Sequence, residues 1–247
     1  MSGKLYIVPT PVGNLGDMTP RAVETLRNVD MILCEDTRTS GVLLKHFGIT
    51  TPTSSHHKYN EHDTTSRVVA RLSGGENIAL VSDAGTPGIS DPGFMLVREA
   101  RVAGIDVETL PGPTALIPAL VNSGLPCDRF TFEGFLPPKK GRRTRLEELS
   151  VEPRTFVIYE SPLRLCTTLK ELAETCGPTR RAAVCREISK MHDSTHTGTL
   201  CELVEYFSAN QPRGEIVIII EGMAGSAPKK VHRNKYRDSS EASSDNL

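Results

Sequence analysis

The chain has 247 residues, enough for two modest domains or one large α/β unit. Hydrophobic residues make up 38% of the sequence, so it can bury a sizeable core. Its 29 Lys and Arg residues and 30 Asp and Glu residues give a formal net charge of −1. That balance excludes a protein that coats nucleic acid through uniform positive charge, but it allows local basic patches.

The cysteines and the apolar runs indicate the compartment. The six cysteines form no Cys-x-x-Cys pair, and no secretory leader is recognised. The longest aliphatic run, Ile216 to Ile220, is too short to cross a bilayer. We therefore expect a cytoplasmic protein with reduced thiols and no membrane-spanning segment.

The first half alternates β-rich runs with segments whose apolar residues recur at helical spacing. Thr19 before Pro20 and Asp91 before Pro92 predict helix N-caps ahead of a first-turn proline. Predicted helix ends lie at three glycines, Gly48, Gly74 and Gly104. This rhythm predicts an α/β fold whose first sheet is mainly parallel, with strands at 5–8, 31–34, 78–82 and 107–110.

The second half predicts a separate α/β domain with strands at 129–135, 155–159, 182–188, 194–199 and 215–221. Ser194 follows Ile188 too closely for a helix to intervene, so this sheet is expected to be mixed. Gly124 and Pro126 break the preceding helix. The expected domains are residues 1–124 and 125–223, and the polar tail 224–247 is expected to be disordered.

Three Gly- and Pro-rich loops follow predicted strands of the first half, at 9–17, 82–93 and 110–115. The carboxyl ends of parallel strands meet at one edge of a sheet, where ligands bind, so the loops are expected to form one cleft. Each loop alone could be an ordinary strand-to-helix turn. The length of the 82–93 loop, and the presence of three such loops on the same edge of the predicted sheet, favour a binding site.

The type of ligand follows from motifs that are missing. There is no P-loop motif and no complete G-x-G-x-x-G after the first strand, so a pyrophosphate cofactor is disfavoured. An adenosyl ligand without phosphates fits better. His192 and His196 lack a third ligand at a convincing spacing, so no metal site is predicted.

Polar clusters begin at or just beyond strand ends, at 34–39, 57–61, 159–162 and 185–193. Asp36 and Arg38 could equally be a surface ion pair. Glu187 and Lys190 are more suggestive of a general base, because charged groups that converge on a cleft often have this role.

Basic residues concentrate in two segments, 139–145 and 229–237, with five in each and no acid in either. Both could be solvated surface. The first could instead contact phosphate groups, through Lys139, Lys140, Arg142, Arg143 and Arg145.

Taken in order from Leu5 to Gly222, these motifs resemble the small-subunit ribosomal RNA 2′-O-methyltransferases, within the tetrapyrrole methylase (class III) group of S-adenosylmethionine enzymes. The segment 82–93 is the most diagnostic. Leu163 and Asp193 depart from the residues usual in that family. The resemblance implies a homodimer of two-domain protomers that bind S-adenosylmethionine in the interdomain cleft. The acceptor it implies is the ribose 2′-hydroxyl of a decoding-centre cytidine in 16S rRNA of the small subunit.

By position, the resemblance places two groups of residues around the cofactor. The first domain would contribute Pro11, Ser82, Asp83, Ala84, Gly85, Ser90, Gly112, Pro113 and Ala115. The second domain would contribute Phe135, Leu136, Tyr159 and Gly214.

For catalysis, we hypothesise that Glu187 or Glu160 is the general base, and the sequence does not rank the two. Three cations would orient phosphate and ribose and stabilise developing charge: Arg38, Arg186 and Lys190. The alternatives are a tetrapyrrole C-methyltransferase of the uroporphyrinogen or precorrin type, a dinucleotide oxidoreductase, and a non-catalytic RNA-binding protein.

Overall fold

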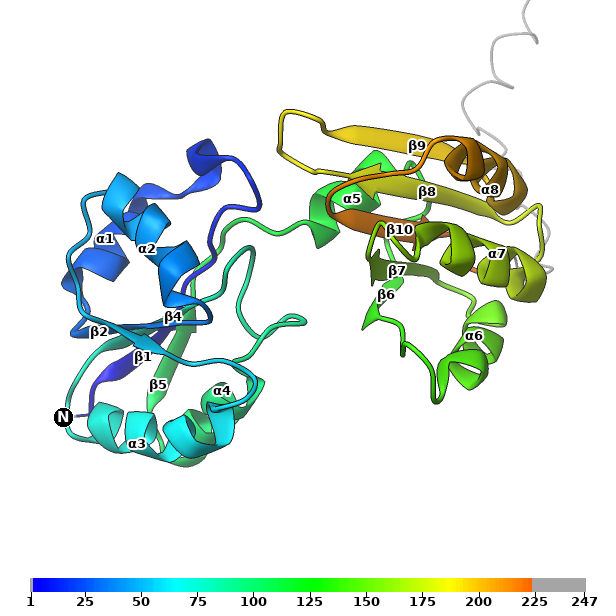
Figure 1. Cartoon of the computed structure of the whole chain (residues 1–247). Helices are drawn as coiled ribbons and strands as arrows, with labels where there is room; N and C mark the ends of the chain where they lie inside the picture. The colour runs from blue at the N-terminus through cyan, green and yellow to red at the C-terminus, as the bar shows by residue number, and fades with distance from the viewer. Residues whose placement is uncertain (1, 224–247) are drawn as a thin grey trace, which may run out of the picture.

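The computed structural model describes residues 2–223, which form two α/β domains (Figure 1). The tail expected to be disordered, 224–247, and the basic segment 229–237 lie outside the described residues. Among the helices of residues 2–223, none combines the length and the hydropathy that a membrane-spanning segment needs. The α/β class and the pairing of a parallel with a mixed sheet are confirmed.

The first domain is a five-stranded parallel sheet in the order β3-β2-β4-β1-β5. Its strands are β1 (Lys4–Ile7), β2 (Met31–Cys34), β3 (Thr53–Ser55), β4 (Ile78–Val81) and β5 (Asp106–Thr109). The four longer strands match the predicted runs within one or two residues. β3 was not predicted because its exposed Thr-Ser-Ser sequence carries no apolar signal.

Helices cover both faces of this sheet (Figure 1). One face packs on α1 (Pro20–Asn28) and α2 (Thr37–His46), and the other on α3 (Glu61–Ser73) and α4 (Phe94–Val102). A short 3-10 turn, η1 (Leu15–Asp17), lies in the loop after β1. Because both faces are buried, β2 and β4 are apolar throughout rather than alternating.

The capping predictions have mixed outcomes. Thr19 caps α1 as predicted, since its side chain accepts a hydrogen bond from the Ala22 backbone N–H. Asp91 is not an N-cap: α4 begins at Phe94, and Gly93 precedes it with φ of 136°. Asp91 therefore lies inside the 82–93 loop, and the expectation of a cap there was wrong.

The second domain is a mixed sheet in the order β6-β7-β10-β8-β9, in which the β6–β7 pair is parallel and the rest are antiparallel. The strands are β6 (Phe130–Phe135), β7 (Thr155–Glu160), β8 (Arg181–Arg186), β9 (Ser194–Thr199) and β10 (Ile216–Ile220). One face packs on α6 (Arg142–Ser150), α7 (Leu165–Cys176) and α8 (Leu200–Ala209).

The other face of the second sheet is covered by α5 (Leu116–Asn122). Ala119 and Leu120 on this helix are buried against Val157, Ala183 and Ile219. Packing therefore puts α5 in the second domain, whereas the predicted boundary between 124 and 125 put it in the first. The chain crosses between the domains in the loop after β5, since the break at Gly124 ends α5 rather than the domain.

Candidate functional site

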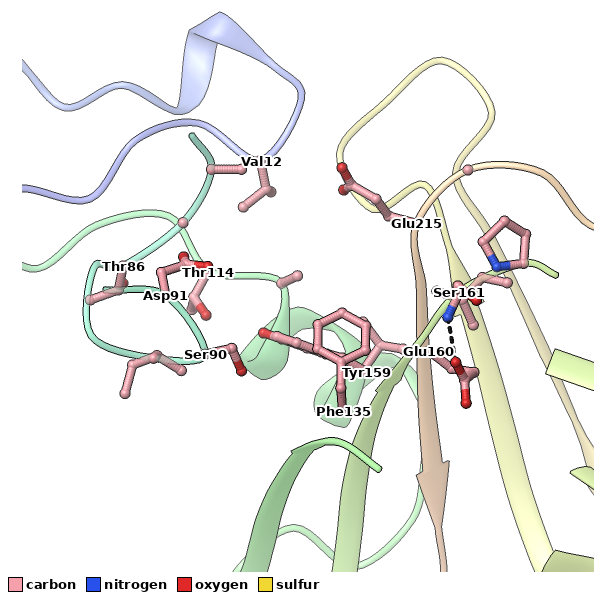
Figure 2. Close-up of a pocket in the computed structure, with 18 residues that line it drawn as sticks. Val12, Thr86, Ser90, Asp91, Thr114, Phe135, Tyr159, Glu160, Ser161 and Glu215 are labelled. Carbon is pink, nitrogen blue, oxygen red and sulfur yellow. Dashed lines mark hydrogen bonds between the residues drawn. The ribbon is translucent and has the colours of Figure 1, made fainter. Parts of the chain in front are cut away.

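A cavity of about 380 Å³ lies between the two domains (Figure 2). The first domain lines it with the loops that follow β1, β4 and β5. The second domain lines it with the ends of β6 and β7 and the start of β10. The side chains and backbone at its wall belong to Val12, Ala84, Gly85, Thr86, Ile89, Ser90, Asp91, Thr114, Ala115, Phe135, Tyr159, Glu160, Ser161, Pro162, Gly214, Glu215, Ile216 and Val217.

Backbone hydrogen bonds tie the three loops of the first domain together. Thr10 and Gly85 exchange two N–H to C=O bonds of 2.9 Å. The Thr10 hydroxyl also donates to the Ser82 carbonyl at 2.9 Å, and the Thr86 hydroxyl donates to the Pro113 carbonyl at 3.3 Å. The loops expected to gather at one edge of the sheet thus form one connected wall.

A second cavity of about 660 Å³ adjoins the first and shares Val12 and Thr114 with it. Its lining includes Gly112 and Pro113 from the first domain, and Ile188 and Ser189 from the second. The cleft between the domains therefore has two compartments.

The predicted cofactor residues divide into three groups. Seven line the first cavity: Ala84, Gly85, Ser90, Ala115, Phe135, Tyr159 and Gly214. Gly112 and Pro113 line the second cavity. The remaining four line neither of the two cavities: Pro11, Ser82, Asp83 and Leu136.

Ser82 and Leu136 are buried beneath the wall. The Ser82 hydroxyl donates to the carbonyl of Ala84 at 3.3 Å and so shapes its own loop. Leu136 belongs to the hydrophobic core that includes α6 and α7.

Aromatic rings form the second-domain side of the cavity. Tyr159 packs edge-to-face against Phe132 and Phe135, with ring centroids 5.0 and 5.8 Å away. Burial raises the pKa of Tyr159, and its hydroxyl points across the cavity toward Thr114 and Asp91 (Figure 2). Phe135 is 56% exposed, so its ring is open to a ligand or to solvent.

The Asp91 carboxylate gives the opposite wall, in the first domain, a negative character. Burial raises the pKa of Asp91 to about 6, and the nearby acids Glu35 and Asp83 add to the effect. The pKa values of Glu35 and Asp83 are also raised, again mainly by burial. The sequence reasoning missed Asp91 as a site residue because Asp-Pro looked like a helix cap.

Glu160, one of the two predicted bases, directs its carboxylate into the second domain. Oε1 accepts hydrogen bonds from the Ser161 backbone N–H at 2.7 Å and from Arg164 Nε at 2.9 Å. Oε2 accepts from the Thr168 hydroxyl at 2.6 Å. Arg142 Nη2 in turn donates to that hydroxyl at 2.7 Å. The side chain is 0% exposed, so Glu160 contributes its backbone to the cavity and its charge to a buried network.

Glu187, the other predicted base, forms a small ionic cluster at the junction of the domains. Its Oε1 accepts from Lys190 Nζ at 3.0 Å and from the Glu215 backbone N–H at 2.8 Å, and these contacts lower its pKa. Lys190 also pairs with the Glu215 carboxylate at 3.1 Å. A Cβ on Gly13 would lie 2.2 Å from Lys190 Cγ, so this lysine packs closely on the first domain.

The two predicted arginines lie in different places. Arg186 donates to the carbonyls of His192 at 3.0 Å and Arg213 at 3.3 Å, and so holds two loops of the second domain together. Arg38 is 90% exposed and pairs with Asp36, which caps α2. Neither arginine lines the first cavity.

The basic segment 139–145 contains both exposed and buried side chains. Lys139 and Lys140 are exposed, and Arg143 is 92% exposed with a surface pair to Glu147. Arg142 is buried and pairs with Glu171 at 2.6 Å. Arg145 Nη1 pairs with Glu148 at 2.6 Å, and its Nη2 pairs with the buried Glu133.

Known proteins define the family. A family model described as Tetrapyrrole (Corrin/Porphyrin) Methylases matches residues 4–204. The chain belongs to this family. A curated relative from Synechocystis sp., named Ribosomal RNA small subunit methyltransferase I, is 53% identical over 96% of this chain and 85% of its own length. Relatives of the same name from Pseudomonas aeruginosa and Escherichia coli O157:H7 are each 49% identical, over 90% and 89% of this chain and 79% and 78% of theirs. The resemblance drawn from the motifs is confirmed.

Solved structures agree with the fold of this member of the family. A cobalt precorrin-4 methyltransferase superposes with a TM-score of 0.64 at 16% identity, over 88% of this chain and 94% of that one. A uroporphyrin-III C-methyltransferase from Thermus thermophilus superposes with a TM-score of 0.62 at 21% identity, over the same shares. At these identities the likeness establishes the two-domain architecture.

Proposed function

We propose that this protein is an S-adenosylmethionine-dependent methyltransferase that modifies ribosomal RNA of the small subunit. The observation that carries the proposal is the 53% identity, over 96% of the chain, to a relative named for that activity. The preformed cavity between the domains supports it, because the three bonded loops and the second domain enclose a site of the size that a small-molecule methyl donor needs.

The residues at the cavity fit S-adenosylmethionine. A volume of about 380 Å³ is within the range of small-molecule sites, roughly 300–1,000 Å³. The donor carries a positively charged sulfur, and the cavity offers the Asp91 carboxylate and the rings of Phe135 and Tyr159, which attract cations. When bound, S-adenosylmethionine supplies an electrophilic methyl group. The backbone of Ala84, Gly85, Thr114 and Ala115 would hold the adenosine portion, with the predicted contacts of Gly112 and Pro113 in the adjoining compartment.

We further propose that the acceptor is the ribose 2′-hydroxyl of a decoding-centre cytidine in 16S rRNA. Exposed cations support an RNA substrate: Lys139, Lys140 and Arg143 lie on the segment that follows Phe135, itself part of the cavity wall. Buried Arg142 would instead keep that segment in shape. Positioning the acceptor oxygen against the methyl group would supply much of the rate.

The other predicted catalytic residues receive roles that match their contacts. Lys190 and Glu187 would hold the second domain against Gly13 of the first, and Arg186 would fix the loops around them. Arg38 remains a candidate for phosphate contact, since its guanidinium is exposed. Glu160 would hold the strand end that lines the cavity.

The test is methyl transfer from S-adenosylmethionine labelled in its methyl group to small ribosomal subunits that lack the modification. The expected product, after digestion of the RNA to nucleosides and mass spectrometry, is 2′-O-methylcytidine. Naked 16S rRNA and large subunits serve as comparison substrates. Transfer to a uroporphyrinogen or precorrin, with none to RNA, would overturn the proposal in favour of the tetrapyrrole alternative. Binding of small subunits without methyl transfer would favour the alternative of a non-catalytic RNA-binding protein.

We also propose, from the family resemblance, that the protein acts as a homodimer in the cytoplasm. Sedimentation equilibrium should give twice the chain mass, and a mass of one chain at micromolar concentration would refute the dimer.

A further inference from the structure

We propose that Asp91 accepts the proton of the acceptor hydroxyl during methyl transfer. This inference rests on the proposed function and names a catalytic residue for it. The proton leaves the hydroxyl for a carboxylate oxygen of Asp91. The oxygen's electron pair forms the new bond to the methyl carbon, and the pair of the broken carbon–sulfur bond stays on sulfur. Charge and atoms balance without another reactant.

The first argument compares the carboxylates at the cavity. A general base needs a lone pair that faces the substrate. Glu160 uses both oxygens within the second domain and is fully buried. Glu187 is bound by Lys190 and by a backbone N–H. Glu215 is 68% exposed and also pairs with Lys190. Within residues 2–223, Asp91 lines the cavity and pairs with no Lys, Arg or His.

The second argument is the placement of Asp91 by its loop. Gly93 takes φ of 136°, and its backbone N–H donates to Glu61 Oε1 at 3.0 Å, which anchors the end of the loop to α3. Ser90, directly before Asp91, takes φ of 68°, a conformation that costs free energy for a residue with a Cβ. Tyr159 of the second domain faces Asp91 across the cavity (Figure 2). The loop thus holds this carboxylate at the junction of both domains.

The charges around Asp91 suit a base. Burial and the acids Glu35 and Asp83 raise its pKa to about 6, while the Ser82 hydroxyl partly opposes the shift. Tyr159 faces it from the second domain as a neutral phenol whose own pKa is raised. A pKa near 6 leaves Asp91 mostly ionised at pH 7 and basic enough to take a proton, which is the compromise that general bases require.

The first experiment observes the group without catalysis. In protein labelled with ¹³C at the aspartate carboxyls, one resonance should titrate near pH 6 and disappear in Asp91→Asn. Adding S-adenosylmethionine should lower that midpoint, because a positively charged sulfur favours the carboxylate. A midpoint near the ordinary aspartate pKa of about 4 would overturn the inference.

The second experiment separates the base from a cofactor ligand. Single-turnover methylation of small subunits, at saturating S-adenosylmethionine, should fall about 100-fold or more in Asp91→Asn. The dissociation constant for S-adenosylmethionine, measured by calorimetry, should also rise, because Asp91 faces the positively charged sulfur, but the rate at saturating cofactor should fall by far more than this loss of affinity explains. The wild-type methylation rate should fall tenfold per pH unit below the inflection of its pH profile, and Asp91→Asn should lose this pH dependence. Asp106→Asn, at the amino-terminal end of β5, removes the same charge and should behave as wild type.

The outcomes are distinguishable. If the wild type transfers no methyl group to small subunits, the proposed function fails. If the wild type is active and Asp91→Asn keeps a rate within about threefold, or loses only affinity for S-adenosylmethionine, Asp91 is not the proton acceptor. Asp91→Glu, which keeps the carboxylate, should recover part of the rate and the pH dependence.

Discussion

Replacing Glu160 by Gln tests whether this carboxylate is structural or catalytic. The side chain is fully buried and receives three hydrogen bonds, from the Ser161 backbone, Arg164 and Thr168. Gln keeps the volume and one acceptor oxygen. It removes the charge that faces Arg164, and its amide presents N–H groups where Thr168 now donates.

The magnitude follows from these contacts. A hydrogen bond to a charged group is worth roughly 1.5–3 kcal/mol, and breaking a buried ion pair on one side costs about 3–5 kcal/mol. Because Arg164 remains 37% exposed and can turn to water, we expect Glu160→Gln to lose about 2–3 kcal/mol of unfolding free energy. For a chain of this size that corresponds to a fall of about 4–12 °C in Tm.

The assay pairs thermal unfolding with single-turnover methylation well below the lowered Tm. Glu160→Gln should unfold earlier while its folded fraction keeps a rate within about threefold of wild type. Glu174→Gln lies exposed on the same helix, α7, and should change stability by less than about 0.5 kcal/mol. Unchanged stability together with a rate loss of about 100-fold would make Glu160 the base and refute our reasoning.

Three further predictions concern the junction, the basic segment and pH. Gly13→Ala places a methyl group against Lys190 and so disturbs the junction of the domains. The affinity for S-adenosylmethionine, measured by calorimetry, should therefore fall severalfold, while ion pairs on the surface away from the junction should be unaffected. Lys139→Ala with Lys140→Ala should weaken subunit binding and reduce its salt slope by roughly one per lost phosphate contact. Asp91 binds its proton more tightly in the folded protein, so stability should fall as pH rises from about 4 to about 6, and urea titrations of Asp91→Asn should lack that decline.

The sequence predicted the parts of the fold that depend on local patterning. The alternation of buried runs and amphipathic segments specified the parallel sheet, and the close spacing of Ile188 and Ser194 specified an antiparallel pair. The three loops were placed at one edge because parallel strands leave no other choice. By contrast β3 carries only polar, exposed residues, so its pairing with β2 depends on the neighbouring strand rather than on its own pattern.

What the sequence could not supply were contacts made at long range. The sequence of α5 does not indicate which sheet the helix covers. Its packing against the apolar face formed by Val157, Ala183 and Ile219 assigns it to the second domain. The Asp-Pro pair at Asp91 satisfies the pattern of an N-cap, yet the Gly93 N–H is held by Glu61 and the helix begins two residues later than predicted.

The ranking of the two glutamates depends on partners that lie apart in the sequence. Glu160 meets Thr168 and, through it, Arg142, while Glu187 meets Lys190 and the backbone of Glu215. Spacing alone places both residues near a cleft. Burial and hydrogen bonding decide which carboxylates are already engaged.

The division of charge across the cleft bears on how an RNA could enter it. Asp91, with Glu35 and Asp83 near it, gives the first-domain wall a negative charge, which favours a cationic sulfur and repels phosphate. The exposed cations Lys139 and Lys140 lie instead on the second domain, beyond Phe135. In the proposed complex, the RNA backbone would therefore rest on the second domain while one ribose reaches toward Asp91. Such an approach delivers a neutral hydroxyl, rather than a phosphate, to the acidic wall, which is what proton transfer to Asp91 requires.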